Sequence, residues 1–166
     1  MQPLISKLQG KYPDLQFTAG QKFYWSPETG EIFYKSGAKD VKSAWSLLHE
    51  TGHALLDHKN YQADYELIRL EVAAWQRAKQ VASELDMEIN EDHIQDCLDT
   101  YRDWLYKRSI CPNCTAKSLQ QGDFVHYRCF NCHTSWSVSA NRFNRSYRSK
   151  KPADVSAPLP AFFNEF

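Results

Sequence analysis

His49, Glu50 and His53 form an H-E-x-x-H motif inside an apolar stretch of the sequence. Residues four apart on an α-helix lie on one face, one turn above the other, so both imidazoles can reach the same metal ion. Two imidazoles supply half of the tetrahedral ligand set that zinc prefers. Glu50 directly follows the first histidine, where its carboxylate can accept a proton from an attacking water. The motif is therefore typical of a zinc-dependent peptidase.

The sequence around the motif bears on whether its histidines are merely solvated. Apolar residues flank it on both sides, and partly buried polar groups need a partner. This argues against two surface histidines on an amphipathic helix. The flanking apolar residues are Trp45, Leu47, Leu48, Ala54, Leu55 and Leu56.

The third zinc ligand is expected on the next predicted helix, over residues 61–85. Glu71 is the only charged residue on the apolar stripe of that helix. A lone carboxylate among apolar neighbours is unfavourable unless it is paired or binds a metal, so Glu71 is the preferred ligand. His58 is the alternative. It points away from the ligand face if the motif helix continues past it, but it can swing back if that helix ends near Leu56.

Four cysteines, Cys111, Cys114, Cys129 and Cys132, form two C-x-x-C pairs separated by 14 residues. This spacing predicts a zinc ribbon over residues 109–140. Four thiolates close the coordination sphere, so the second zinc would be structural. Disulfides are a weaker interpretation, because nothing in the sequence indicates export.

A basic and aromatic segment follows the predicted ribbon. Arg142, Arg145 and Arg148 recur every third residue with aromatic residues between them, offering phosphate contacts and stacking surfaces together. We expect these arginines to bind nucleic acid. The alternative is that the charges only keep a linker soluble.

Composition agrees with one ordinary domain and a small appendage. The chain has 166 residues, 42% of them hydrophobic, and a formal net charge of zero. Residues 1–110 carry 13 Lys+Arg against 17 Asp+Glu, and residues 111–166 carry 7 against 3, so the two parts have net charges of −4 and +4. The first residues lack the apolar core of a signal peptide, and no run approaches the ~20 apolar residues of a membrane span. A cytoplasmic location without membrane association is expected.

Periodicity and capping residues give the expected elements. A hairpin and three main helices should form an α+β, zincin-like metallopeptidase domain over residues 1–108, followed by the ribbon and by a basic segment and flexible tail over 141–166. The expected helices are 3–12, 41–57 capped by Asp40, 61–85, and 91–108 capped by Asn90; the expected strands are 22–25, 31–35, 124–128 and 134–138.

With H-E-T-G-H at residues 49–53 and Glu71-Val-Ala-Ala-Trp75, residues 20–85 resemble the ImmA/IrrE family of bacterial zinc metallopeptidases. The resemblance implies that His49, His53 and Glu71 bind zinc, that Glu50 is the general base, and that DNA-binding repressors are a substrate class. The ribbon departs from this family. It looks more like the SprT-like proteases, which act on DNA-associated proteins but use a third histidine.

Two functions of different class follow. The first is a zinc endopeptidase with one catalytic and one structural zinc, acting on a protein substrate, with DNA or a DNA-bound protein as a further candidate partner. The second is a non-catalytic, zinc-stabilised module that binds nucleic acid or protein. The sequence favours the enzyme, because a structural site gains nothing from a glutamate beside its ligand.

Overall fold

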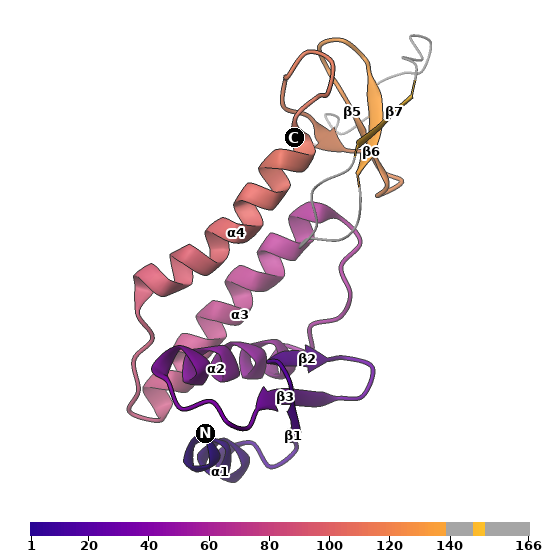
Figure 1. Cartoon of the computed structure of the whole chain (residues 1–166). Helices are drawn as coiled ribbons and strands as arrows, with labels where there is room; N and C mark the ends of the chain where they lie inside the picture. The colour runs from indigo at the N-terminus through magenta and orange to yellow at the C-terminus, as the bar shows by residue number, and fades with distance from the viewer. Residues whose placement is uncertain (139–147, 152–166) are drawn as a thin grey trace, which may run out of the picture. The chain divides into compact units, whose positions relative to one another are not determined.

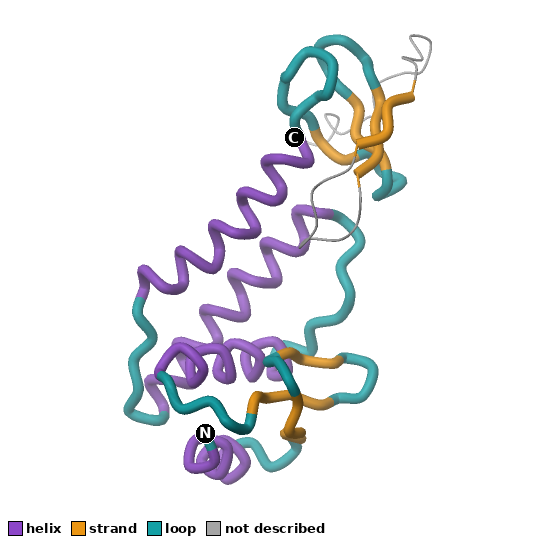
Figure 2. Tube along the Cα trace, in the orientation of Figure 1, coloured by secondary structure: helices purple, strands orange, loops and turns teal. Residues whose placement is uncertain are grey.

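The computed structural model describes residues 1–138 and 148–151, and the chain divides into two compact units. The first unit comprises Met1–Tyr61 and Glu66–Leu98, and the second comprises Gln62–Tyr65 and Asp99–Phe166. The fold is mixed α and β, as the sequence predicts (Figures 1 and 2). Within the described residues, no helix has the length and apolar character needed to cross a membrane.

In the first unit, a three-stranded sheet has the order β1-β3-β2. The antiparallel pair of β2 (Tyr24–Ser26) and β3 (Glu31–Lys35) is the predicted hairpin. Its turn closes where the Gly30 amide donates to the Ser26 carbonyl over 2.9 Å, and Gly30 has a φ of +70°. The strand β1 (Gln16–Gly20), which pairs in parallel with β3, is not expected from the sequence pattern. This strand has no fully buried residue, so it lacks the alternating apolar signal.

The motif helix is α2 (Val41–Leu55). Asp40 caps it as predicted, accepting a hydrogen bond from the Ser43 amide over 2.9 Å. The helix ends earlier than the expected residue 57, because Asp57 takes a left-handed conformation with a φ of 49°. The Asp57 amide donates to the Ala54 carbonyl, and the His58 amide donates to the His53 carbonyl, both over 3.1 Å. This is the Schellman arrangement of a helix C-terminus, and it turns His58 back over the last turn of the helix.

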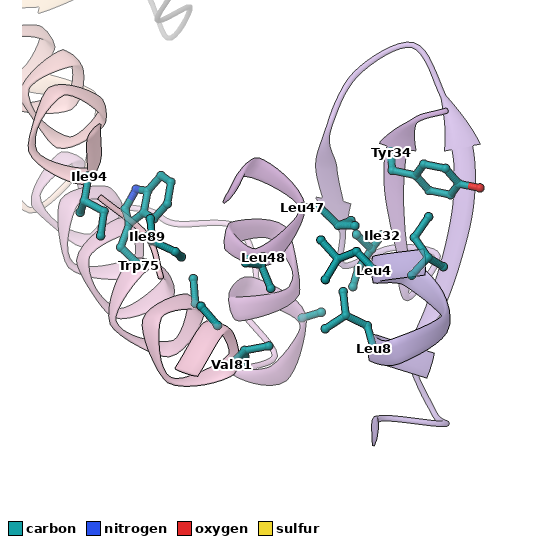
Figure 3. Close-up of a cluster of buried hydrophobic side chains, with 14 of the residues drawn as sticks. Leu4, Leu8, Ile32, Tyr34, Leu47, Leu48, Trp75, Val81, Ile89 and Ile94 are labelled. Atoms are coloured by element: carbon teal, nitrogen blue, oxygen red, sulfur yellow. The ribbon is translucent and has the colours of Figure 1, made fainter. Parts of the chain in front are cut away.

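The core of the first unit forms around α2, which packs against β2 and β3. Figure 3 shows Leu47 of α2 beside Ile32 of β3 and Leu4 of α1 (Gln2–Lys11). Leu47 and Leu48 are completely buried. Truncating either to alanine should destabilise the unit by about 2–5 kcal/mol. This packing fixes the helix that carries the motif.

Two longer helices follow, α3 (Asp64–Glu84) and α4 (Glu91–Ser109). Each contributes residues to both units. Asn90 caps α4 as predicted, accepting from the His93 amide over 2.9 Å. In the first unit, apolar residues of both helices join the core, among them Trp75, Ala78, Val81, Ile94 and Leu98.

The second unit contains a four-stranded antiparallel sheet with the order β4-β5-β6-β7. Strands β5 (His126–Arg128) and β6 (Ser135–Val138) lie within the predicted strands. Two further strands, β4 (Leu119–Gln120) and β7 (Arg148–Lys151), are not expected from the sequence pattern, and β7 lies in the basic segment. These outer strands are short, and local patterning gives them no distinct signal.

Near the ribbon, the second unit buries an ionic cluster. Arg108 Nε donates to Oδ2 of Asp64 over 2.6 Å, and the Tyr127 hydroxyl donates to the same oxygen. Trp136 Nε1 donates to the Arg108 carbonyl over 3.1 Å. Because all these side chains are buried, removing one charged partner should cost about 3–5 kcal/mol. The cluster joins the first residues of α3 to the end of α4 and to the ribbon.

Candidate metal centres

The structure brings His49, His53 and Glu71 together in the first unit, with one ligand atom from each lying within 4.8 Å of the others. Nε2 of His49 lies 3.2 Å from Oε2 of Glu71, and Nε2 of His53 lies 3.7 Å from Oε1 of Glu71. In tetrahedral coordination with ~2.0–2.1 Å bonds, ligand atoms lie about 3.3 Å apart. The two Nε2 atoms and the carboxylate therefore fit a shared metal ion.

Gly52 sets how closely α2 and α3 approach. A Cβ atom at Gly52 would lie 2.4 Å from the carbonyl oxygen of Ala74 in α3. That oxygen belongs to the backbone and cannot move aside cheaply. The glycine of the H-E-T-G-H motif therefore permits the helix contact that places Glu71 opposite the two histidines.

Burial makes these polar groups costly unless a ligand engages them. His49 and Glu71 are only 8% and 6% exposed. Within the described residues, His49 Nε2 and Glu71 Oε2 are buried without a hydrogen-bond partner. Two such atoms facing each other in a ligand set of imidazole and carboxylate fit a zinc ion.

Burial and the close approach of acidic and basic groups shift the pKa values of His49 and Glu71. Burial alone would lower the pKa of His49, but the carboxylates of Glu50 and Glu71 raise it to about 9. Burial alone would raise the pKa of Glu71, but His49 and His53 hold it well below its usual range. Without a metal, the site thus pairs a carboxylate with a protonated imidazole.

Glu50 lies beside the ligand group and is held by the backbone of the hairpin. Its Oε2 accepts a hydrogen bond from the Trp25 amide over 2.8 Å, and its Oε1 lies 3.4 Å from Nδ1 of His49. Trp25 belongs to β2, an outer strand of the sheet, so the hairpin both packs on the helix and holds the Glu50 carboxylate in place. Sequence reasoning missed this donor, since a backbone amide leaves no trace in residue type.

Two further aromatic side chains line the ligand histidines. The indole of Trp75 stacks on His49 with ring centroids 4.2 Å apart and an interplanar angle of 22°. Trp75 lies one turn after Glu71, and helical periodicity places both residues on the same apolar stripe. His58 lies beside His53, with their Nδ1 atoms 2.9 Å apart. Burial, followed by the neighbouring His53, lowers the pKa of His58.

The second centre consists of Cys111, Cys114, Cys129 and Cys132, whose sulfur atoms all lie within 4.8 Å of one another. The Sγ atoms of Cys111 and Cys132 are 3.5 Å apart, and those of Cys114 and Cys129 are 3.4 Å apart. A tetrahedral zinc site with ~2.3 Å bonds needs sulfur separations of about 3.8 Å. Both separations are close to this value and all four sulfur atoms lie within 4.8 Å of one another, so the four thiols can hold one ion.

Hydrogen bonds and burial tune these thiols in different directions. The Thr134 hydroxyl lies 3.2 Å from Sγ of Cys132 and, with the Thr134 backbone amide, lowers the pKa of that thiol to about 5. Burial raises the pKa of Cys111 to about 11. A metal ion offsets this penalty by binding the thiolate directly.

The predicted nucleic-acid residues divide between described and undescribed parts of the chain. Arg142 and Arg145 lie outside the described residues. Arg148 begins β7, and its backbone is paired with Val138 of β6. Part of the basic segment is therefore a strand of the ribbon sheet.

Comparison with protein families, with curated proteins and with solved structures yields no match for this chain. The function is therefore argued from the geometry and chemistry of the two centres.

Proposed function

We propose that this protein is a zinc-dependent endopeptidase. His49, His53 and Glu71 hold the catalytic ion, and Glu50 is the general base. The observation that carries the proposal is the pair of buried atoms, His49 Nε2 and Glu71 Oε2, that face each other without a hydrogen-bond partner within the described chain. A carboxylate held beside that pair completes the arrangement needed for metal-assisted hydrolysis.

The contrast between the two centres supports a catalytic role for the first. Four cysteine thiolates fill a tetrahedral sphere, whereas two imidazoles and one carboxylate leave a position for water or substrate. A structural site also has no use for a glutamate next to its first ligand. These differences favour an enzyme over a non-catalytic binding module.

An ion held by His49, His53 and Glu71 would supply Lewis-acid activation of the attacking water and the scissile carbonyl. Glu50 accepts the proton of the water and delivers it to the amine leaving group. The Trp25 amide keeps the Glu50 carboxylate in place through Oε2. The Trp75 indole stacks on His49 and restrains that ring.

The deciding experiment compares cells that contain the wild type with cells that contain Glu50→Gln, by proteomic mapping of newly formed protein termini. The amide has a similar size but cannot accept the proton, so cleavage should disappear while both metal ions stay bound. Glu71→Ala should instead lose one ion, and Glu84→Ala on the same helix should lose none. Identical termini in wild-type and Glu50→Gln cells would contradict a peptidase and favour the binding module.

We further propose that the ribbon and the basic segment direct the peptidase to DNA or to a DNA-bound protein such as a repressor. Residues 111–151 carry 7 Lys+Arg and a single acidic residue, Asp123. Pairing of β7 with β6 makes Arg148–Lys151 part of the ribbon sheet. A folded unit with this charge suits a polyanion, because phosphate contacts release counterions.

Fluorescence anisotropy with single- and double-stranded DNA tests this targeting. Binding should weaken steeply as salt rises, and changing Arg142, Arg145 and Arg148 together to glutamine should flatten the salt dependence. Cleavage of a short peptide should survive this change. Absence of binding at low salt would leave the arginines as solubilising charges.

A further inference from the structure

The C-terminus of α2 places His58 against a candidate ligand, although His58 is not in the ligand group. In the Schellman arrangement, the amide of the residue two positions after the C-cap donates to the carbonyl of the residue three positions before the C-cap. These residues are His58 and His53, and the His58 amide donates to the His53 carbonyl over 3.1 Å. A hydrophobic contact often accompanies this motif, but here the side chains meet through their Nδ1 atoms, 2.9 Å apart.

The two nitrogens of His53 face different neighbours. Nε2 faces Oε1 of Glu71 over 3.7 Å, and Nδ1 faces His58. A ring that binds a metal through Nε2 carries its proton on Nδ1 and donates it to an outer partner. His58 must then accept through an unprotonated Nδ1, which leaves its own proton on Nε2.

We propose that His58 is a positioning residue of the metal site, whose Nδ1 accepts the Nδ1–H of His53 and so fixes that ligand in the tautomer and orientation that present Nε2 to the ion. The inference rests on the proposed catalytic site, but it assigns His58 a role that differs from direct ligation. Carboxylates and carbonyls commonly take this outer position. In this chain, a second imidazole occupies it.

His58 is itself anchored. Trp25 Nε1 donates to the His58 carbonyl over 2.8 Å, while the Trp25 amide donates to Glu50. One residue of β2 therefore restrains both the general base and the support of His53. Such anchoring lets the outer imidazole act as a fixed acceptor.

Zinc affinity tests the assignment without any measurement of cleavage. We expect the first equivalent of zinc to fill the four-cysteine site, and a competing chelator reports the affinity for the second equivalent. His58→Phe should weaken the second site by roughly 10–100-fold, because the phenyl ring fills the space but accepts no hydrogen bond. His58→Gln should keep most of the affinity, since its amide oxygen can accept. The cysteine site in the same chain should stay unchanged, which controls for the zinc competition itself, and unchanged denaturant unfolding of the first unit controls for its folding.

Nitrogen NMR of the zinc-loaded protein adds a signature that a purely structural role would not give. We expect a proton on Nδ1 of His53 and on Nε2 of His58, and loss of a fixed His53 tautomer in His58→Phe. Equal losses of affinity in His58→Phe and His58→Gln would make His58 a direct ligand and overturn the proposal, as would unchanged affinity in both. A wild type that binds only one zinc would instead reject the proposed catalytic site.

Discussion

At the scale of single residues, Glu71 shows how burial converts an ordinary acid into a candidate ligand. An isolated buried carboxylate is expensive, and two imidazoles on the neighbouring helix offset that cost. The compensation is incomplete, since Oε2 lies 3.2 Å from Nε2 of His49 as an ion pair but makes no hydrogen bond among the described residues. A metal cation would complete this compensation. In the metal-free site, the protonated imidazole of His49 supplies the positive charge instead.

The raised pKa of His49 predicts that zinc binding releases a proton. With a pKa of about 9, the imidazole is protonated at pH 7 in the metal-free protein, and the proton must leave when Nε2 binds zinc. The affinity should therefore rise about tenfold per pH unit as pH approaches 9, and binding at pH 7 should release about one proton. Calorimetry of the second zinc equivalent, in buffers of different ionisation enthalpy, measures the number of protons released.

Glu50→Gln supplies the control for this measurement. Glu50 is one of the two carboxylates that raise the pKa of His49 against burial, so removing its charge should move the proton release to lower pH. At pH 8, the variant should release fewer protons than the wild type. Equal release by both proteins would show that Glu50 does not influence His49.

At the scale of elements, the distance between α2 and α3 controls the ligand geometry. Gly52→Ala would set a Cβ atom 2.4 Å from the Ala74 carbonyl oxygen and push the helices apart. We expect destabilisation of about 1–3 kcal/mol, with a weaker second zinc site. Denaturant unfolding and chelator competition measure the two effects. Gly10→Ala, which meets no atom within 4 Å, is the matched control and should leave zinc affinity unchanged.

The two C-x-x-C turns have the same backbone conformation. Thr115 and His133, the residues after the second cysteine of each pair, have φ angles of 62° and 59° and donate to the first cysteine's carbonyl over 3.0 Å. Neither is glycine, which adopts this conformation without strain. In addition, the ring nitrogen Nδ1 of His133 is buried without a partner in the described chain.

Glycine at either position should therefore stabilise the zinc-loaded ribbon. We expect a gain of about 1 kcal/mol for His133→Gly and less for Thr115→Gly, because Thr115 also loses its hydroxyl bond to the Cys114 carbonyl. Thermal unfolding followed by tryptophan fluorescence measures the gain. Ala116→Gly, at a position without positive φ, should be neutral or destabilising. The same gain there would show that backbone strain is not the cause.

Sequence reasoning succeeded where a local pattern carries the information. Helical periodicity located the helix that contains Glu71, and capping chemistry located Asp40 and Asn90. It missed β1, which depends on parallel pairing with a later strand, and it extended α2 past the left-handed Asp57. The contacts of Trp25 with Glu50 and His58 were equally out of reach, because they involve backbone groups brought together by folding.

At the scale of the whole molecule, the two units should respond differently to metal removal. The first has an extensive apolar core, whereas the buried hydrophobic cluster among the described residues of the second consists of Cys111, Cys129, Tyr127 and Trp136. Half of that small cluster is cysteine of the candidate metal centre, so we expect its folding to require the ion. A weak chelator should thus empty the histidine site without unfolding, and a strong one should unfold the ribbon.

Hydrogen exchange with mass spectrometry resolves the two steps. After strong chelation, amides of residues 111–138 should lose protection while those of α2 keep theirs. Readdition of zinc should restore protection. Loss of protection in α2 at the same chelator concentration would show that the first unit also depends on the cysteine-bound ion.

The ionic cluster of the second unit bears on the order of events during synthesis. Asp64 finds its partners Arg108 and Tyr127 only 44 and 63 residues later in the chain. Closing such loops in an unstructured chain carries an entropic cost, and most of the intervening residues belong to the first unit. Once those residues are packed, the span left to close is short. On the ribosome, the first unit would therefore form while Asp64 is still a solvated charge, and the ribbon would assemble last.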